Sequence, residues 1–170
     1  MPVRRILQLG DPLLRAVSEV VADPAQAAPV LADLEDTLAG FRSAHSFGRA
    51  ISAIQIGARV RVIFMRVNEV RYELINPAFT WKSEETFELW DDCFSFPDLM
   101  VRLNRHKAVR LRHQDRGGKW HEFDAKSDLA ELIQHEMDHL DGILAVDHAM
   151  GPDALSTREE WLRQRAQAPA

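Results

Sequence analysis

The segment from His135 to His139 reads His-Glu-Met-Asp-His, which combines residues that bind metal ions with one that can move a proton. The two imidazoles are four residues apart, so on an α-helix they lie on one face and can bind the same ion. The carboxylate of Glu136 follows the first imidazole and can act as a general base. Histidines at this spacing also occur on solvated helices, and a catalytic metal site needs a third protein ligand and an open position for water.

Three positions come into question as the source of that third ligand. One class of zinc protease has a third histidine six residues after the second, but Ala145 stands there. Another class has a glutamate about twenty residues downstream, where this chain has Glu159, although Arg158 and Arg163 replace the asparagine and aspartate that accompany it. The third candidate is Cys93, the single thiol of the chain. A lone cysteine is more often a small buried apolar residue than a ligand, so residue type alone leaves the choice open.

The elements that must position these residues can be read from the apolar pattern. Apolar residues at spacings of three and four from Leu129 to Leu140 predict that the histidines lie on a helix. Ser127 or Asp128 is expected to cap its start, and Gly142 stands where a C-terminal glycine stop belongs. The same reasoning predicts a first long helix over residues 24–44 and a last amphipathic helix over residues 152–165.

Between the first helix and the histidine helix the sequence is typical of β-structure. Residues 60–65 and 70–75 predict a hairpin, with Asn76-Pro77 ending its second strand. Strands grouped around one helix indicate an α+β domain, with antiparallel β-sheets packed around a central helix and a further helix at the C-terminus. We expect residues 1–170 to form one catalytic domain. Further extended runs are expected at residues 86–90, 101–103, 107–112 and 120–123.

The overall composition restricts the partners of the chain. The chain has 21 Lys and Arg against 26 Asp and Glu, a net charge of −5, so no overall basic field attracts nucleic acid or anionic lipid. We therefore expect no direct nucleic-acid binding and no membrane partner. With one cysteine, no secretory signal and no run near the roughly 20 apolar residues that span a bilayer, a cytoplasmic location is expected.

Several segments together resemble the sequence motifs of the peptide deformylase family. Residues 134–142, Gln-His-Glu-Met-Asp-His-Leu-Asp-Gly, closely resemble the third motif of that family. Residues 91–95, Asp-Asp-Cys-Phe-Ser, are similar to its Glu-Gly-Cys-Leu-Ser motif, and residues 48–55 are similar to its Gly-x-Gly-x-Ala-Ala-x-Gln motif. The opening residues 6–15 are also similar to the family's N-terminus, so the resemblance extends over most of the chain.

This resemblance implies a reaction and a set of roles. It implies one divalent metal ion, Fe²⁺ being expected and Zn²⁺ or Ni²⁺ being substitutes, bound by Cys93, His135 and His139. It also implies Glu136 as general base, with Gln55 and the backbone N–H of Phe94 stabilising the oxyanion. The implied reaction removes the N-formyl group from the N-terminal methionine of newly made polypeptides and releases formate. The substrate partner is then a formylated peptide, and a transient contact with the ribosome is compatible with this role.

The resemblance also identifies expected substrate-binding residues, Gly48, Ala50 and Asp92, two of which depart from the family's motifs. Ala50 and Asp92 both stand where glycine is expected, and both add side chains beside the expected path of the substrate. Because the residues implied in the chemistry are retained, we expect intact chemistry with altered substrate recognition. Arg105 is a candidate ion-pair partner for Asp91, as an arginine is for the motif glutamate in this family.

Two alternative functions remain at this point. One is an amidase of the same fold that acts on another N-acyl substrate. The other is a non-catalytic paralogue that binds formylated N-termini or metal without turnover. The retained Glu136 argues against the second alternative, since a protein that only binds has no need of a base.

Overall fold

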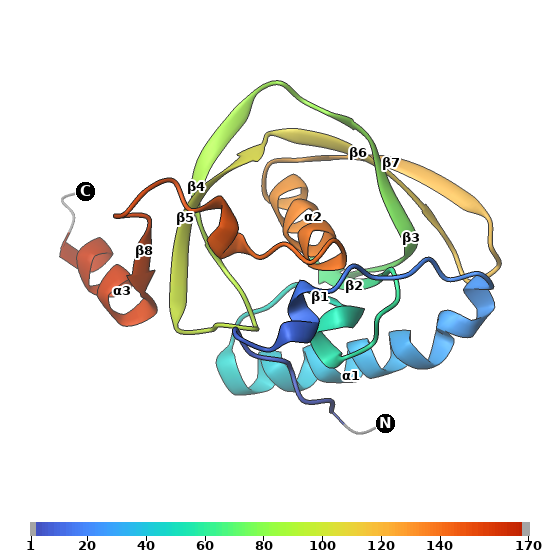
Figure 1. Cartoon of the computed structure of the whole chain (residues 1–170). Helices are drawn as coiled ribbons and strands as arrows, with labels where there is room; N and C mark the ends of the chain where they lie inside the picture. The colour runs from blue at the N-terminus through green and yellow to red at the C-terminus, as the bar shows by residue number, and fades with distance from the viewer. Residues whose placement is uncertain (1–2, 168–170) are drawn as a thin grey trace.

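The structure, a computed structural model, describes residues 3–167 and contains two antiparallel sheets with a helix between them (Figure 1). The larger sheet has the order β1-β2-β3-β6-β7, and the smaller has the order β4-β5-β8. The predicted α+β class, with antiparallel sheets around a central helix and a helix near the C-terminus, is confirmed. The strands are β1 (Ala50–Ser52), β2 (Val62–Val67), β3 (Val70–Lys82), β4 (Thr86–Asp92), β5 (Leu99–His106), β6 (Ala108–Gln114), β7 (Trp120–Lys126) and β8 (Leu155–Thr157).

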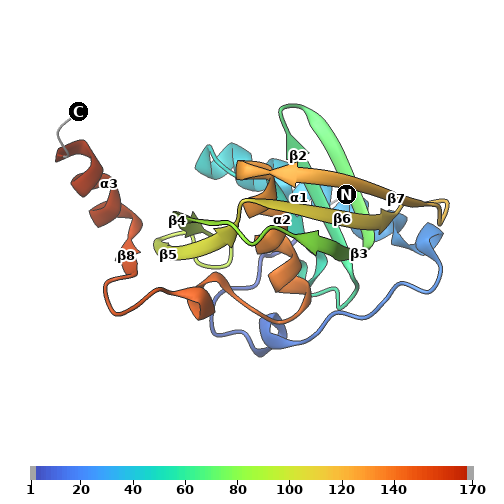
Figure 2. The ribbon, with the colours of Figure 1, turned by 90° about the horizontal axis from the view of Figure 1, so that it is seen from above.

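Three α-helices are present in residues 3–167, and each has a different environment. Helix α1 lies along the outside of the larger sheet, α2 lies between the two sheets, and α3 projects from the body (Figures 1 and 2). Within these residues, no helix is both long and apolar enough to cross a membrane. The helices are α1 (Ala28–His45), α2 (Ser127–Leu140) and α3 (Arg158–Gln167), and short 3₁₀ turns occur at Pro12–Arg15, Pro24–Ala27, Ala53–Ile56 and Ala145–His148.

Strand β2 shows how the core is divided between α1 and α2. Successive side chains of a strand point to opposite faces of its sheet. Ile63 and Met65 pack into the cluster that includes the apolar face of α2, whereas Val62 and Phe64 pack into the cluster that includes α1. Because both faces are covered, the first four residues of β2, Val62 to Met65, are all apolar and buried, and the strand packs against α1 on one face and α2 on the other.

The predicted hairpin is confirmed, but its second strand is longer than expected. Asn68 and Glu69 join β2 to β3 with φ values of 48° and 64°, as a tight two-residue turn requires. Strand β3 does not end at Asn76-Pro77; it continues to Lys82 through a register shift. Asn76 adopts a φ of 51°, and its side chain bonds both backbone groups of Val21, so a tertiary contact stabilises the bulge.

The start of α2 also differs from the prediction. Neither Ser127 nor Asp128 caps the helix, because the N-cap position is Lys126 and no side chain caps it. Ser127 has a φ of 51°, and its N–H donates to the carbonyl of Lys107 at 2.9 Å, so a contact with the connection between β5 and β6 directs the chain from β7 into the helix. At the other end, Gly142 has a φ of 73°, as expected of a C-terminal glycine stop.

The last helix begins later than predicted and is not amphipathic. Residues Leu155–Thr157 form β8, which pairs with β5, and α3 begins only at Arg158. None of the α3 residues is buried. Leu155, one of the apolar residues within the predicted helix, lies in β8 of the smaller sheet instead.

Candidate metal centre and active site

The structure brings together the three side chains expected to bind a metal ion. The Nε2 atoms of His135 and His139 are 3.2 Å apart, and the Sγ atom of Cys93 is 3.2 Å from Nε2 of His139. All three side chains are buried. Two nitrogens bound to one tetrahedral metal ion at about 2.0–2.1 Å are themselves about 3.3 Å apart, so the spacing of these donors fits a metal ion.

Each of these residues has a structural reason for its position. His135 and His139 project from successive turns of α2, which both sheets enclose. Cys93 directly follows β4, and its Sγ accepts the N–H of Ser95 at 3.4 Å in the turn that leads to β5. The group therefore joins an edge of the smaller sheet to the central helix. Glu159, the alternative ligand, is exposed on α3 and belongs to no such group.

The protonation of the two imidazoles differs because their neighbours differ. Burial and the neighbouring His135 lower the pKa of His139 well below its usual value, which leaves a lone pair for a metal ion. Burial opposes a charge on His135 too, but the carboxylate of Asp91, 2.9 Å from Nδ1, raises the pKa of His135 well above its usual value. A metal ion that binds Nε2 of His135 displaces the proton from that nitrogen. The contact between Asp91 and Nδ1 orients the ring so that Nε2 faces the position of the ion.

The pairing expected between Arg105 and Asp91 is confirmed, and it is part of a longer chain of contacts. Arg105 lies 3.3 Å from Asp91 and 2.5 Å from Asp138, and it is almost completely buried. Although burial opposes ionisation, His135 and Arg105 lower the pKa of Asp91. Asp91 is therefore a charged carboxylate that holds the ring of His135 in one orientation.

Glu136 lies beside the metal group and is held by Ser52. The Ser52 hydroxyl is 2.5 Å from Oε2 of Glu136 and 3.0 Å from its backbone carbonyl oxygen. Burial raises the pKa of Glu136 to about 7, although His135 and Ser52 oppose this shift. A divalent cation bound nearby would lower that pKa. Burial and a bound cation thus act on Glu136 in opposite directions, and a carboxylate beside a metal-bound water can accept a proton and return it.

Gln55 and Phe94 lie beside the thiol of Cys93. The backbone N–H of Ser52 donates to Oε1 of Gln55 at 2.9 Å, which leaves the Nε2 amide facing Cys93 Sγ at 3.6 Å and Ser95 Oγ at 3.3 Å. Within residues 3–167 the N–H of Phe94 donates to no protein acceptor. The Phe94 N–H therefore lies unpaired next to Cys93, and the Gln55 amide is a second N–H donor beside the same thiol.

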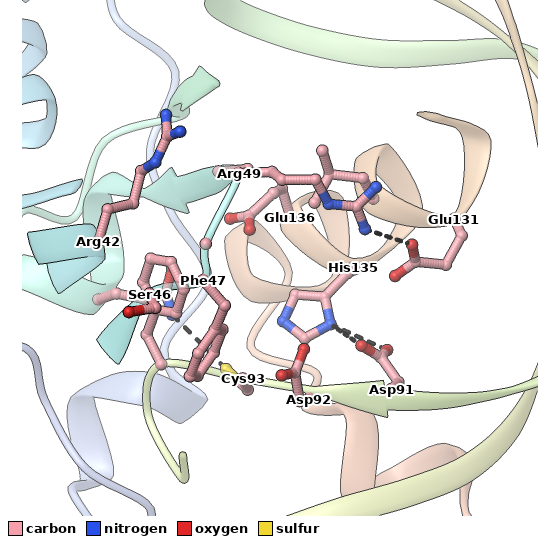
Figure 3. A pocket seen from close by; sticks show the side chains of 15 residues that line it. Arg42, Ser46, Phe47, Arg49, Asp91, Asp92, Cys93, Glu131, His135 and Glu136 are labelled. Atoms are coloured by element: carbon pink, nitrogen blue, oxygen red, sulfur yellow. Dashed lines mark hydrogen bonds and ion pairs between the residues drawn. The ribbon is translucent and has the colours of Figure 1, made fainter. Parts of the chain in front are cut away.

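The three expected substrate-binding residues line the same cavity, of about 380 Å³, as Cys93, His135 and Glu136 (Figure 3). Gly48 has a φ of 120°, and a Cβ there would lie 2.4 Å from Cζ of Phe94, so both conformation and space require glycine. Ala50 is buried in β1. Asp92 is only partly exposed and pairs with Arg158 at 2.5 Å.

Three residues of this site were missed from the sequence. Arg49 and Glu131 line the cavity and form an ion pair with a separation of 3.0 Å (Figure 3). Arg158, from the start of α3, pairs with Asp92 and lies over the ring of Phe47 at 4.4 Å. The position of Glu131, one helical turn before His135, was the available signal, since residues four apart share a helix face.

Asp91, Glu131 and His135 form a second buried group with metal-ligand atoms. The ligand atoms of this second group already have protein partners, because Asp91 bonds Nδ1 of His135 and Arg49 pairs with Glu131. Burial raises the pKa of Glu131, and the nearby Asp91 adds to this effect, while His135 and Arg49 oppose it.

Comparison with known proteins agrees with this geometry. The model of the polypeptide deformylase family matches residues 3–154. A peptide deformylase of Bartonella tribocorum is 37% identical over 155 residues, covering 87% of this chain and 85% of the relative. Peptide deformylase 2 of Clostridium perfringens is 36% identical over 151 residues, covering 88% of this chain and 94% of the relative.

Solved structures show the same fold. The crystal structure of peptide deformylase from Thermotoga maritima superposes with a TM-score of 0.81 at 28% identity, covering 89% of this chain and all of that chain (100%). A peptide deformylase from Synechococcus elongatus in complex with actinonin gives a TM-score of 0.82 at 26% identity, covering 99% of this chain and 88% of that chain. With its sequence, fold and metal-ligand group all in agreement, the chain belongs to the peptide deformylase family.

Proposed function

We propose that this protein hydrolyses the N-formyl amide at the N-terminus of newly made polypeptides, for which methionine is the expected first residue, and releases formate. The observation that carries the proposal is that Cys93, His135 and His139 bring their ligand atoms within 4.8 Å of one another. Cys93 and His135 also line one cavity together with Glu136 and Gln55. The family assignment does not favour the two alternatives, a different N-acyl substrate or a non-catalytic paralogue.

The metal site is proposed to hold one divalent ion on Cys93, His135 and His139. A thiolate with two imidazoles suits both Fe²⁺ and Zn²⁺, and we propose Fe²⁺ as the native ion with Zn²⁺ or Ni²⁺ as substitutes. Such an ion lowers the pKa of a bound water and polarises the carbonyl that the water attacks. Metal analysis of protein purified without oxygen tests the identity of the ion.

The protein's own groups are proposed to handle the proton and the developing charge. Glu136 would accept a proton from the attacking water and deliver it to the amine nitrogen that leaves. Ser52 restrains this carboxylate, since its hydroxyl lies 2.5 Å from Oε2. Nε2 of Gln55 and the N–H of Phe94 would donate hydrogen bonds to the formyl oxygen as it gains negative charge.

The substrate backbone is proposed to lie along the segment from Gly48 to Ala50. Strand β1 is an end strand of the larger sheet and, within residues 3–167, pairs with β2 alone, so its other edge can accept an added strand. Glycine at position 48 lets Phe94 approach this edge closely. Asp92 also lines the cavity, and its pairing with Arg158 restrains it.

The test is formate release from a formyl-methionyl peptide by protein loaded anaerobically with Fe²⁺, and separately with Ni²⁺. We expect formate and a free amine in equal amounts, and no product after chelation. Metal-loaded protein that binds one equivalent of ion yet releases no formate would contradict the proposal.

The setting of the reaction is also proposed. We infer that residues 1–170 act as one catalytic domain in the cytoplasm, where the proposed substrate is made, with a transient ribosome contact. Cosedimentation of the protein with ribosomes that carry formylated nascent chains tests this contact. Nothing in the net charge of −5 favours direct nucleic-acid binding.

A further inference from the structure

The wall of the active-site cavity beyond the metal group is polar and charged. Glu131 lies on α2 one turn before His135, and Arg49 directly precedes β1. Nη2 of Arg49 lies 3.0 Å from Oε2 of Glu131, and Figure 3 shows the two side chains meeting beside His135. The Glu131 side chain is 10% exposed and that of Arg49 is 42% exposed, so the pair forms part of the lining that a ligand meets.

The distance from the metal group places this pair within reach of the substrate's first side chain. Glu131 and His135 lie on the same face of α2, and a carboxylate oxygen of Glu131 lies within 4.8 Å of a ring nitrogen of His135. In a formylated peptide the first Cα is two bonds from the formyl carbon. With the formyl group at the metal position, an unbranched side chain the length of methionine is long enough to reach Glu131 and Arg49.

The contacts of the pair decide which side chain suits this wall. Arg49 donates one hydrogen bond, to Oε2 of Glu131, and within residues 3–167 its other N–H groups and Oε1 of Glu131 have no protein partner. A thioether or alkyl side chain would remove water from these groups and return no hydrogen bond, which is costly for charged groups. A primary amide both accepts from Arg49 and donates to Glu131, while its methylene groups pack on Leu132, which also lines the cavity.

We propose that Arg49 and Glu131 determine specificity by selecting a polar, hydrogen-bonding side chain at the first residue of the formylated substrate. The inference rests on the proposed function. An apolar side chain of the same size, methionine included, is still accepted but reacts less efficiently. Glutamine is the expected best match, because the ion pair is neutral overall and offers both donors and an acceptor.

The first experiment compares formyl-glutaminyl, formyl-methionyl and formyl-norleucyl peptides with the same following residues, using the metal-loaded enzyme. The three side chains have nearly the same length, so the comparison isolates polarity. We expect kcat/KM for the glutamine peptide to exceed that for norleucine by about tenfold or more, since a site with unpaired polar groups rejects an apolar analogue. Equal values, or faster norleucine, overturn this proposal while the deformylase activity stands. No formate from any of the three overturns both.

The second experiment removes the pair as a unit with Arg49→Leu and Glu131→Leu together, because either single change leaves a charge unpaired. The double variant should reverse the preference, so that norleucine exceeds glutamine. A ratio unchanged from that of the wild type overturns the proposal. Arg49→Lys keeps the charge pair and should keep the preference for glutamine, which provides a readout even if the double variant folds poorly.

A matched control is the ion pair between Arg66 and Glu35, which is 3.1 Å long and lies outside the cavity. Replacing both of these residues by leucine changes charge and volume in the same way. The ratio of the glutamine rate to the norleucine rate should stay at its wild-type value in that control. A shift in the control equal to that of the cavity variant would assign the effect to general destabilisation and overturn the proposal.

Discussion

At the scale of single residues, Glu136 carries the proposed proton transfer. Glu136→Gln keeps the size of the side chain and an oxygen that can accept from Ser52, 2.5 Å away in the native protein. We expect the variant to bind one metal ion as before and to lose roughly 10²–10⁴-fold in kcat, the usual contribution of general acid–base catalysis. Metal content and formate release measure the two properties separately. Glu159→Gln, at an exposed position on α3, is the control and should change neither. Full turnover in Glu136→Gln would exclude the role.

Gly48 is a position where adding a single Cβ atom should affect both stability and activity. Gly48→Ala places a Cβ 2.4 Å from Cζ of Phe94 and also forces alanine to a φ of 120°. Gly10→Ala imposes a similar φ of 103° but meets nothing within 4 Å, so it isolates the conformational cost. We expect each change to lower the free energy of unfolding by roughly 1–3 kcal/mol, while only Gly48→Ala moves Phe94 and reduces kcat. Urea unfolding and formate assays test this, and an active Gly48→Ala enzyme would contradict the proposed place of the Phe94 N–H.

At the scale of elements, Arg158 attaches the C-terminal segment to the rim of the cavity. It pairs with Asp92, lies over Phe47 and donates to the carbonyl of Pro97 at 2.6 Å, which links α3 and β8 to β4. Arg158→Ala should cost roughly 1 kcal/mol, because the pair is partly exposed and the ring contact is modest. Amide exchange should become faster in Leu155–Thr157. The control Arg163→Ala removes a contact made within α3 alone, to Glu160, and should leave β8 unchanged; equal exchange in both variants would refute the link.

At the scale of the whole molecule, a bound metal ion joins parts that fold separately along the chain. Cys93 follows β4 of the smaller sheet, whereas His135 and His139 lie on α2, which packs against the larger sheet. An ion that binds the folded state alone stabilises it by about 4 kcal/mol when its free concentration is a thousand times its Kd.

Chelation should therefore lower Tm by roughly 10 °C for a protein of this size. Returning Zn²⁺ should restore the Tm. In Cys93→Ser the shift should be much smaller, because the thiolate ligand is lost. Differential scanning calorimetry with and without chelator measures the effect, and an identical Tm for metal-loaded and metal-free protein would show that these three residues do not hold an ion in the folded state.

The sequence by itself determined the parts of this protein that depend on local geometry. The i, i+4 spacing of His135 and His139 on an apolar-periodic segment specifies a helix with two ligands on one face, whatever surrounds it. The hairpin of β2 and β3 follows likewise from two β-rich runs with a short polar turn. The choice of Cys93 as third ligand needed the family resemblance, because residue type alone left Glu159 open.

Contacts between residues distant in sequence decided the rest. The bulge at Asn76 depends on Val21, 55 positions away, so the local signal for a strand end was overridden. Arg49 and Glu131 are 82 positions apart, and Arg158 and Asp92 are 66 apart. Each of these residues taken alone resembles an ordinary surface charge. The packing of α2 between the sheets places Arg49, Glu131 and Asp92 in the lining of one cavity, and the pairing of β8 with β5 brings Arg158 to Asp92. The sequence could not show this, because a side chain's environment is set by whatever the fold brings against it.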